Sequence, residues 1–369
     1  MTNFLITKRR DIFSYLCSQK KEKETSSIMS ILIIRFSSIS NVSMIIPLLD
    51  SLVRNHQEKK FVVTSRFFLA PLFESLPNVQ FAPADIRNKH KGIGGVFRLF
   101  KELKKNHTIN TIIDLQNDWR SCFLRILFGL SGIKVYSIST NKKEEWKLLL
   151  QKNKKKKPLK SLFDRYQKTL TKAHLRTDNQ FKSLKLNQTE TIKKIETIYG
   201  KKQEKWIGIA PFAQTKGKLL PLKKTKEVID FFDKKGNYKI FLFGAGEVEN
   251  EILIDWASIF KNVYAVHTSL LLGEELELIK QLDVMLSMDS ANMHLASLVN
   301  TPVVSVWGAT HYFAGNLGWK QSKDNIIDVD LPCRPCSING TNHCKKNNFE
   351  CLQMIDTKVI IQKILEILK

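Results

Sequence analysis

The sequence predicts an α/β fold made of two doubly wound, mainly parallel sheets, each in its own domain. At 369 residues, the chain is longer than one hydrophobic core of ordinary size. Apolar residues make up 43% of it, enough for two cores. Apolar runs of strand length alternate with helical patterns in two series, and this alternation is typical of parallel sheets.

The first series begins with an apolar run at 31–35. A short polar turn leads into a helical pattern at 44–52 with Pro47 in its first turns, where a missing N–H matters least. The periodicity then predicts strands at 61–64, 79–81, 109–115 and 135–138, and helices at 67–76, 96–103 and 120–130.

The middle of the chain loses this long periodicity. Residues 141–160 are rich in lysine, and we expect a basic helical hairpin or loop there, followed by a linker near 185–203. The lysines between Lys152 and Lys160 either contact anionic lipid or substrate phosphates, or they form a solvated loop.

The second series predicts strands at 206–210, 239–243, 263–265, 284–287 and 303–306, and helices at 224–235, 248–259, 274–281 and 291–298. Gly244 and Gly246 follow a strand, and we interpret them as a strand-to-helix turn rather than a dinucleotide site. An amphipathic helix closes the chain after Asp356. Two such sheets that face each other leave a ligand cleft between the carboxyl ends of their strands.

These patterns give the expected domain bounds. Residues 1–28 are predicted to be an extension outside the fold, either loose or not translated, with a membrane-surface helix as the alternative. Their apolar run at 12–17 is too short for a signal peptide. We expect an N-terminal domain at 29–190, a C-terminal domain at 200–355 and the closing helix at 356–369.

The net charge of +24 favours polyanionic partners such as nucleic acid, anionic lipid or phosphorylated glycans, or it reflects lysine used as surface filler. No recognisable nucleic-acid module accompanies the charge, so we expect no nucleic-acid partner. No apolar stretch reaches eighteen residues, so we predict no transmembrane helix.

Three strand ends carry residues suited to a phosphate ligand. Asp289 and Ser290 precede the helix at 291–298, whose first N–H groups either bind an anion or are merely capped. Gly308 and Thr310 follow the next strand, where glycine permits an unusual backbone angle and close approach to a ligand. Lys218 lies on the loop after the strand at 206–210 and can reach a diphosphate as a point charge.

Four elements together resemble the ADP-heptose:lipopolysaccharide heptosyltransferases, glycosyltransferase family 9. The family's turn after the first strand resembles Arg35-Phe36-Ser37-Ser38-Ile39-Ser40-Asn41. Its second and third elements resemble Pro211-Phe212-Ala213 with Lys218-Leu219-Leu220-Pro221, and Asp289 to Ala296. Its last element resembles Trp307 to Thr310, and the resemblance covers roughly residues 29–369.

The resemblance implies two facing Rossmann-like domains of the GT-B type, with the acceptor in the first and the donor in the second. It implies an inverting, metal-independent transfer of a sugar, heptose from ADP-heptose, onto a lipopolysaccharide core, with no cofactor. The partners would be a nucleotide sugar and a glycolipid, and the enzyme would be cytoplasmic or peripheral on the inner membrane. The expected donor-binding residues are Lys218, Asp289, Ser290, Ala291, Asn292, His294, Gly308 and Thr310, and the expected acceptor-binding residues are Ser37, Ser38 and Arg120.

One position departs from the family pattern. Asn41 stands where the family usually has its general-base aspartate, and an amide cannot accept a proton at neutral pH. Either the enzyme is slow, or another carboxylate such as Asp114 or Asp118 is the base, or the protein binds donor without transferring sugar.

Four of the six cysteines lie close together near the C-terminus. Cys333 and Cys336 have the first-pair spacing of a zinc knuckle, whereas Cys344 and Cys351 lack the second-pair spacing. Structural zinc, disulfides and free thiols all remain open for these four residues.

Overall fold

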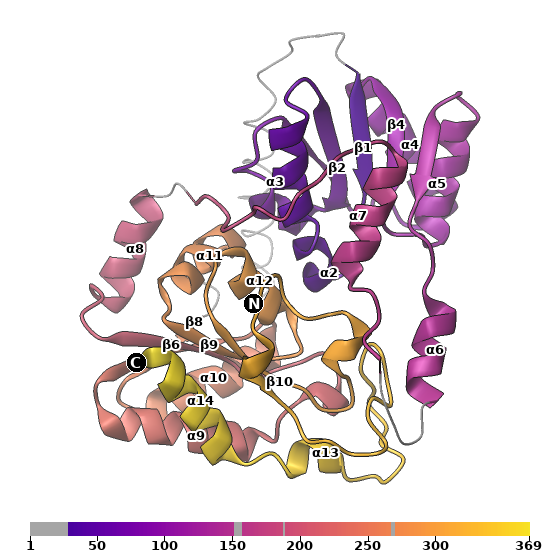
Figure 1. Ribbon diagram of the computed structural model, residues 1–369. Helices are drawn as coiled ribbons and strands as arrows, with labels where there is room; N and C mark the ends of the chain where they lie inside the picture. The colour runs from indigo at the N-terminus through magenta and orange to yellow at the C-terminus, as the bar shows by residue number, and fades with distance from the viewer. Residues whose placement is uncertain (1–28, 151–156, 187–188, 267–269) are drawn as a thin grey trace.

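The computed structural model describes residues 29–150, 157–186, 189–266 and 270–369. Figure 1 shows two α/β bodies, one in the N-terminal half of the chain and one in the C-terminal half. The predicted extension at 1–28 and the lysines at 152–156 lie outside the described residues. No helix in the described part of the chain is long and apolar enough to cross a membrane.

The N-terminal sheet is parallel throughout, in the order β3-β2-β1-β4-β5. β1 is buried along its whole length because helices cover both faces of the sheet. Its elements are β1 (Ser30–Ile34), α2 (Ile39–Ser43), α3 (Ile46–Asn55), β2 (Lys60–Arg66), β3 (Val79–Ala84), α4 (Gly92–Asn106), β4 (Ile109–Asp114), α5 (Trp119–Gly129) and β5 (Lys134–Ser137).

The C-terminal sheet has the order β11-β10-β9-β6-β7-β8 and is also parallel. α14 packs against α9 and the sheet, burying Ile360, Ile364 and Leu368. The elements are β6 (Lys205–Ala210), α9 (Leu222–Lys235), β7 (Tyr238–Phe243), α10 (Glu247–Ile259), β8 (Val263–Val266), α11 (Leu272–Gln281), β9 (Val284–Met288), α12 (Ala291–Leu298), β10 (Val303–Val306), β11 (Ile326–Ile327), α13 (Glu350–Gln353) and α14 (Thr357–Leu368).

The middle segment is more helical than predicted. Most of the expected linker at 185–203 is helical: α8 (Thr189–Tyr199) occupies it, contacts α11 and buries Ile195. α6 (Lys142–Leu150) and α7 (Leu162–Lys172) flank the lysine run. The helix predicted at 67–76 is instead a 3₁₀ helix at Phe67–Leu72 with Pro71 inside it, since proline removes an α-helical hydrogen bond.

Two contacts join the halves where function is expected. α2 packs against α12, so the turn after β1 lies beside the helix after β9 (Figure 1). The segment before α7 also pairs with the loop after β10: Leu159 N donates to Phe313 O at 2.8 Å, and Leu162 N donates to Gly315 O at 3.1 Å. The carboxyl ends of the two sheets are thereby held next to each other.

Candidate active site

The end of β9 holds a compact polar cluster. Asp289 is only 5% exposed, and its Oδ2 accepts a hydrogen bond from Thr310 Oγ1 at 2.8 Å. The Lys218 Nζ lies 2.9 Å from the same oxygen. The structure therefore brings together three residues that the sequence places on separate loops, with one carboxylate oxygen of Asp289 in contact with both Lys218 and Thr310.

α12 begins directly after this cluster. Ser290 is its N-cap residue but makes no side-chain capping bond; its Oγ lies 3.1 Å from Ser287 Oγ. The first N–H groups of the helix, including those of Ala291 and Asn292, have no partner within the helix. With the helix dipole and the Lys218 charge nearby, this terminus suits an anion.

His294 lies one turn into α12 and is 3% exposed. Burial lowers the pKa of His294 to about 4; Asp289 opposes this shift and Lys218 adds to it. The imidazole is therefore neutral at physiological pH. Its Nδ1 has no hydrogen-bond partner among the described residues.

Arg334, which the sequence pattern does not single out, holds the turn after β10 in place. This guanidinium is 2% exposed and donates to the carbonyls of Trp307 and Thr310, both at 3.1 Å, and to that of Gly308. It also pairs with Asp328 at 2.9 Å. In the sequence, the position of Arg334 between Cys333 and Pro335 is the one indication that it lies in a structured loop.

Gly308 serves a purpose other than the predicted one. Its φ lies outside the left-handed region, and a Cβ there would lie 2.4 Å from Gly217 O and 2.6 Å from Leu352 Cγ. Glycine is thus required because the Lys218 loop and α13 approach closely.

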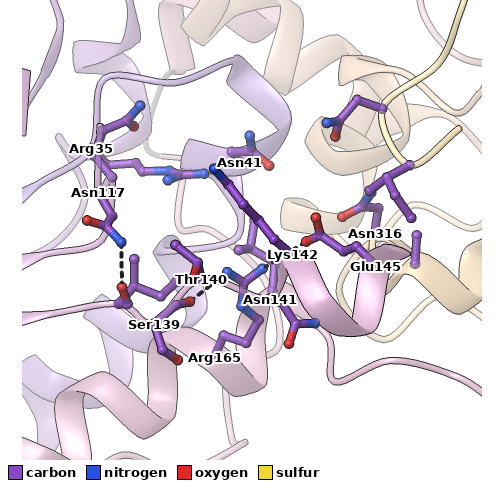
Figure 2. Close-up of a pocket in the computed structure, with 16 residues that line it drawn as sticks. Arg35, Asn41, Asn117, Ser139, Thr140, Asn141, Lys142, Glu145, Arg165 and Asn316 are labelled. Atoms are coloured by element: carbon purple, nitrogen blue, oxygen red, sulfur yellow. Dashed lines mark hydrogen bonds and ion pairs between the residues drawn. The ribbon is translucent and has the colours of Figure 1, made fainter. Parts of the chain in front are cut away.

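A polar pocket of about 230 Å³ lies between the domains (Figure 2). The N-terminal half of the chain contributes Arg35, Asn41, Gln116, Asn117, Ile138, Ser139, Thr140, Asn141, Lys142, Glu145, Leu162 and Arg165, and the C-terminal half contributes Ala314, Asn316, Ile338 and Asn339. The loop that carries Thr310 continues into Ala314 and Asn316, so the pocket adjoins the Asp289 cluster.

Asn41 lies in this pocket and is held on both sides. Its Nδ2 donates to Ser37 Oγ at 2.8 Å, and its carbonyl accepts from the Tyr166 hydroxyl at 3.1 Å. Burial raises the pKa of Tyr166 to about 12, so this hydroxyl stays a donor. Arg35 lies over the Tyr166 ring, 5.4 Å from its centre, and its buried Nε has no partner among the described residues.

Asp114 is poorly suited to the role of base. Its side chain is fully buried, its Oδ1 accepts from the N–H groups of Gln116 and Asn117, and its Oδ2 lies 3.0 Å from Arg125 Nε. These contacts stabilise the strand end and occupy both carboxylate oxygens. The alternative, Asp118, caps α5 by accepting from Ser121 N at 3.0 Å.

Two of the expected acceptor residues stand away from the pocket lining. Arg120 lies over the Trp119 ring and 3.7 Å from Asp118, and Ser38 is an exposed N-cap residue of α2. Ser37 touches the pocket only through Asn41. The pocket instead holds Lys142, Glu145 and Arg165, which the sequence analysis did not name because only tertiary packing brings α6 and α7 to this position.

The four C-terminal cysteines are free thiols in the structure. Burial and the neighbouring Cys333 and Cys344 raise the pKa of Cys336, and burial raises the pKa of Cys351 to about 11. Within the described ranges, no group of three or more potential ligands is arranged to hold a metal ion. The backbone N–H of Cys336 donates to Ala309 O at 3.0 Å, so this loop supports the turn after β10.

Comparison with known proteins gives a consistent result. Residues 96–346 match the profile of glycosyltransferase family 9 (heptosyltransferase). A lipooligosaccharide heptosyltransferase 2 of Campylobacter jejuni is 24% identical over 334 residues, covering 88% of this chain and 95% of that protein.

Two solved structures share the fold. The ADP-heptose lipopolysaccharide heptosyltransferase II of Escherichia coli aligns with a TM-score of 0.68 and 18% identity, covering 92% of this chain and 98% of that one. A family 9 glycosyltransferase of Veillonella parvula aligns with a TM-score of 0.72 and 16% identity, covering 92% and 97%. The expected GT-B arrangement of two parallel-sheet domains is confirmed.

Proposed function

Since the family profile spans more than half of the chain, the protein belongs to glycosyltransferase family 9, the heptosyltransferases, and we propose that it transfers heptose from ADP-heptose to a lipopolysaccharide core. The observation that carries this proposal is the cluster of Lys218, Asp289 and Thr310 at the N-terminus of α12, beside a polar pocket lined by both domains. The curated relative and the Escherichia coli enzyme are named for the same activity and for the same donor, respectively.

We propose that the donor diphosphate binds the free N–H groups at Ser290 to Asn292. Lys218, oriented by Asp289, adds a positive charge, and Thr310 lines the same side. Preorganised donors of this kind neutralise the leaving-group charge without a cation. We therefore expect that a metal chelator leaves the transfer rate unchanged.

The acceptor sugar would occupy the pocket. Arg35, Lys142 and Arg165 give the lining a positive character that suits the anionic groups of a lipopolysaccharide core. An acceptor hydroxyl placed here would attack the anomeric carbon opposite the departing diphosphate, which inverts the configuration. A glycolipid acceptor also favours action at the cytoplasmic face of the inner membrane.

The proposal is tested by calorimetric titration with ADP, UDP, GDP and CMP. We expect ADP to bind, and a variant with Lys218→Ala and Asp289→Ala to lose that binding. The matched control is Lys216→Ala, because Lys216 lies on the same loop but is exposed. Preference for another nucleotide would overturn the ADP-heptose assignment, and no binding to folded protein would remove the donor site.

A second candidate function follows from Asn41. A relative that binds donor without transferring it would show ADP binding but no sugar transfer. Asn41→Asp separates the two candidates: restored transfer in the variant alone would favour the impaired relative, whereas transfer by the native protein favours the transferase.

A further inference from the structure

We propose that Glu145 is the general base of the transfer, taking the proton that Asn41 cannot accept. The inference rests on the proposed transferase function and deepens it. It starts from the pocket lining: among the described residues that surround this pocket, Glu145 is the only carboxylate. Figure 2 shows it on α6, in the same pocket as Asn41 and Asn316.

The other nearby carboxylates already make structural contacts. Asp114 is fully buried and paired with Arg125, and Asp118 caps α5. Asp289 is occupied by Lys218 and Thr310. Asp164 closes the capping box of α7 through Ser161. Each of these groups would have to give up a structural contact before it could accept a proton.

Contacts hold Glu145 in place without occupying its carboxylate. Its backbone N–H donates to Asn141 O at 2.9 Å, which fixes it in the first turn of α6. Its Oε1 lies 3.9 Å from Arg165 Nη1, and Arg165 is itself anchored by donating to Ser139 O at 2.9 Å. In the described part of the chain the carboxylate accepts no hydrogen bond, its side chain is 28% exposed, and Glu145 lines the pocket.

Asn41 then takes a different role. Because its Nδ2 is fixed by Ser37, its Oδ1 is oriented to accept a hydrogen bond from an acceptor hydroxyl or its neighbour. The amide would position the sugar, and the carboxylate across the pocket would take the proton. A positioning residue and a base on two elements replace the single aspartate of the family pattern.

In the proposed step, the Glu145 carboxylate takes the proton of the acceptor hydroxyl as that oxygen forms a bond to the anomeric carbon of heptose. The bond from the anomeric carbon to the diphosphate oxygen breaks, and ADP leaves with the electron pair. The carboxylic acid then releases its proton to solvent through the open side of the pocket.

The test measures heptose transfer from ADP-heptose onto lipopolysaccharide truncated before its heptoses, for native protein, Glu145→Gln and Glu144→Gln. Loss of a general base lowers kcat by about 10²–10⁴-fold, so we expect that loss for Glu145→Gln. Glu144 is exposed and outside the pocket, so its variant should match the native rate. The ADP affinity should be equal in all three proteins.

Two further variants distinguish a catalytic role of Glu145 from a structural one. Glu145→Asp should retain part of the rate, and Asn41→Asp should restore rate in the Glu145→Gln background. If the native enzyme transfers heptose and Glu145→Gln keeps the native rate, Glu145 is not the general base, but the proposed transferase function is upheld. If the native protein binds ADP but transfers no heptose, both the proposed function and the role of Glu145 are contradicted.

Discussion

At the scale of single residues, two buried side chains lie next to the Asp289 cluster. Arg334 donates to the carbonyls of Trp307, Gly308 and Thr310, and His294 is buried within α12. Removing one partner of a buried charged network leaves several groups unsatisfied, which is more costly than losing an exposed contact.

Arg334→Met should therefore lower the free energy of unfolding by about 3 kcal/mol and weaken ADP binding, because the turn that carries Thr310 loses its support. Chemical denaturation and titration with ADP would measure both effects. Arg87→Met, at an exposed position, is the control. Unchanged stability and affinity in Arg334→Met would contradict this view of the loop.

The low pKa of His294 predicts a pH dependence of stability. The unfolded state binds a proton near pH 6.5 and the folded state only near 4, so stability is full above pH 6.5 and falls as the pH drops toward 4. The loss amounts to about 3 kcal/mol over this window. Denaturation of native protein and His294→Gln at several pH values should show a flatter curve for the variant; parallel curves would refute the assignment.

At the scale of elements, the site depends on how closely its loops approach one another. The Lys218 loop, the turn after β10 and α13 meet at Gly308, and Ala309 N donates to Gly217 O at 2.7 Å. The cysteine-bearing loop adds Thr341 O, which accepts from Gly217 N at 2.8 Å. The loops that carry Lys218 and Thr310 are thus held together by a third segment.

Gly308→Ala should lower the free energy of unfolding by about 1–3 kcal/mol, because backbone and a branched side chain must shift to admit the methyl group. The control is Gly94→Ala in α4, where a Cβ meets nothing and the helix should gain about 0.5–1 kcal/mol. Thermal denaturation separates the two. Equal stabilities would mean that the contact at Gly308 relaxes without cost.

An element could be predicted from the sequence where its own residues carry a clear apolar pattern. α12 was predicted at its observed bounds because it lies between two largely apolar, fully buried strands and needs no distant contact to be identified. α8 was missed because it is largely polar and only Thr191, Ile195 and Tyr199 are buried. The helix expected at 67–76 was shortened by Pro71, whose cost the apolar spacing did not reveal.

The same reasoning explains which residues of the candidate site could be proposed from the sequence. The sequence proposes Lys218, Asp289 and Thr310 as site residues because each follows a recognisable strand in a family motif, and the fold brings the three together around one carboxylate. Arg334 and Glu145 were not named because only the fold brings their partners to them: Arg334 donates to carbonyls of the turn after β10, 24 to 27 residues away, and Glu145 lies near Arg165 on α7. Asp114 looked available in sequence, but its partner Arg125 is supplied by the next helix.

At the scale of the whole molecule, two parallel-sheet domains line a polar pocket between them, and the chain carries a net charge of +24. The charge suits an enzyme whose acceptor is an anionic glycolipid. Such attraction is screened by salt, because exposed charges interact weakly beyond about 8 Å at physiological ionic strength.

The protein should therefore sediment with vesicles that contain anionic lipid and be released as salt is raised, because basic residues near a membrane surface each contribute about 1 kcal/mol. Vesicles of neutral lipid should retain little protein at any salt concentration. Binding that ignores both lipid charge and salt would contradict an electrostatic contact with the membrane face.

The most direct test of the account is mass spectrometry of truncated lipopolysaccharide after incubation with ADP-heptose and the native protein, with the Lys218→Ala, Asp289→Ala variant in parallel. The account predicts that the acceptor gains the mass of one heptose with the native protein and not with the variant. An acceptor that stays unchanged while the native protein binds ADP would contradict it.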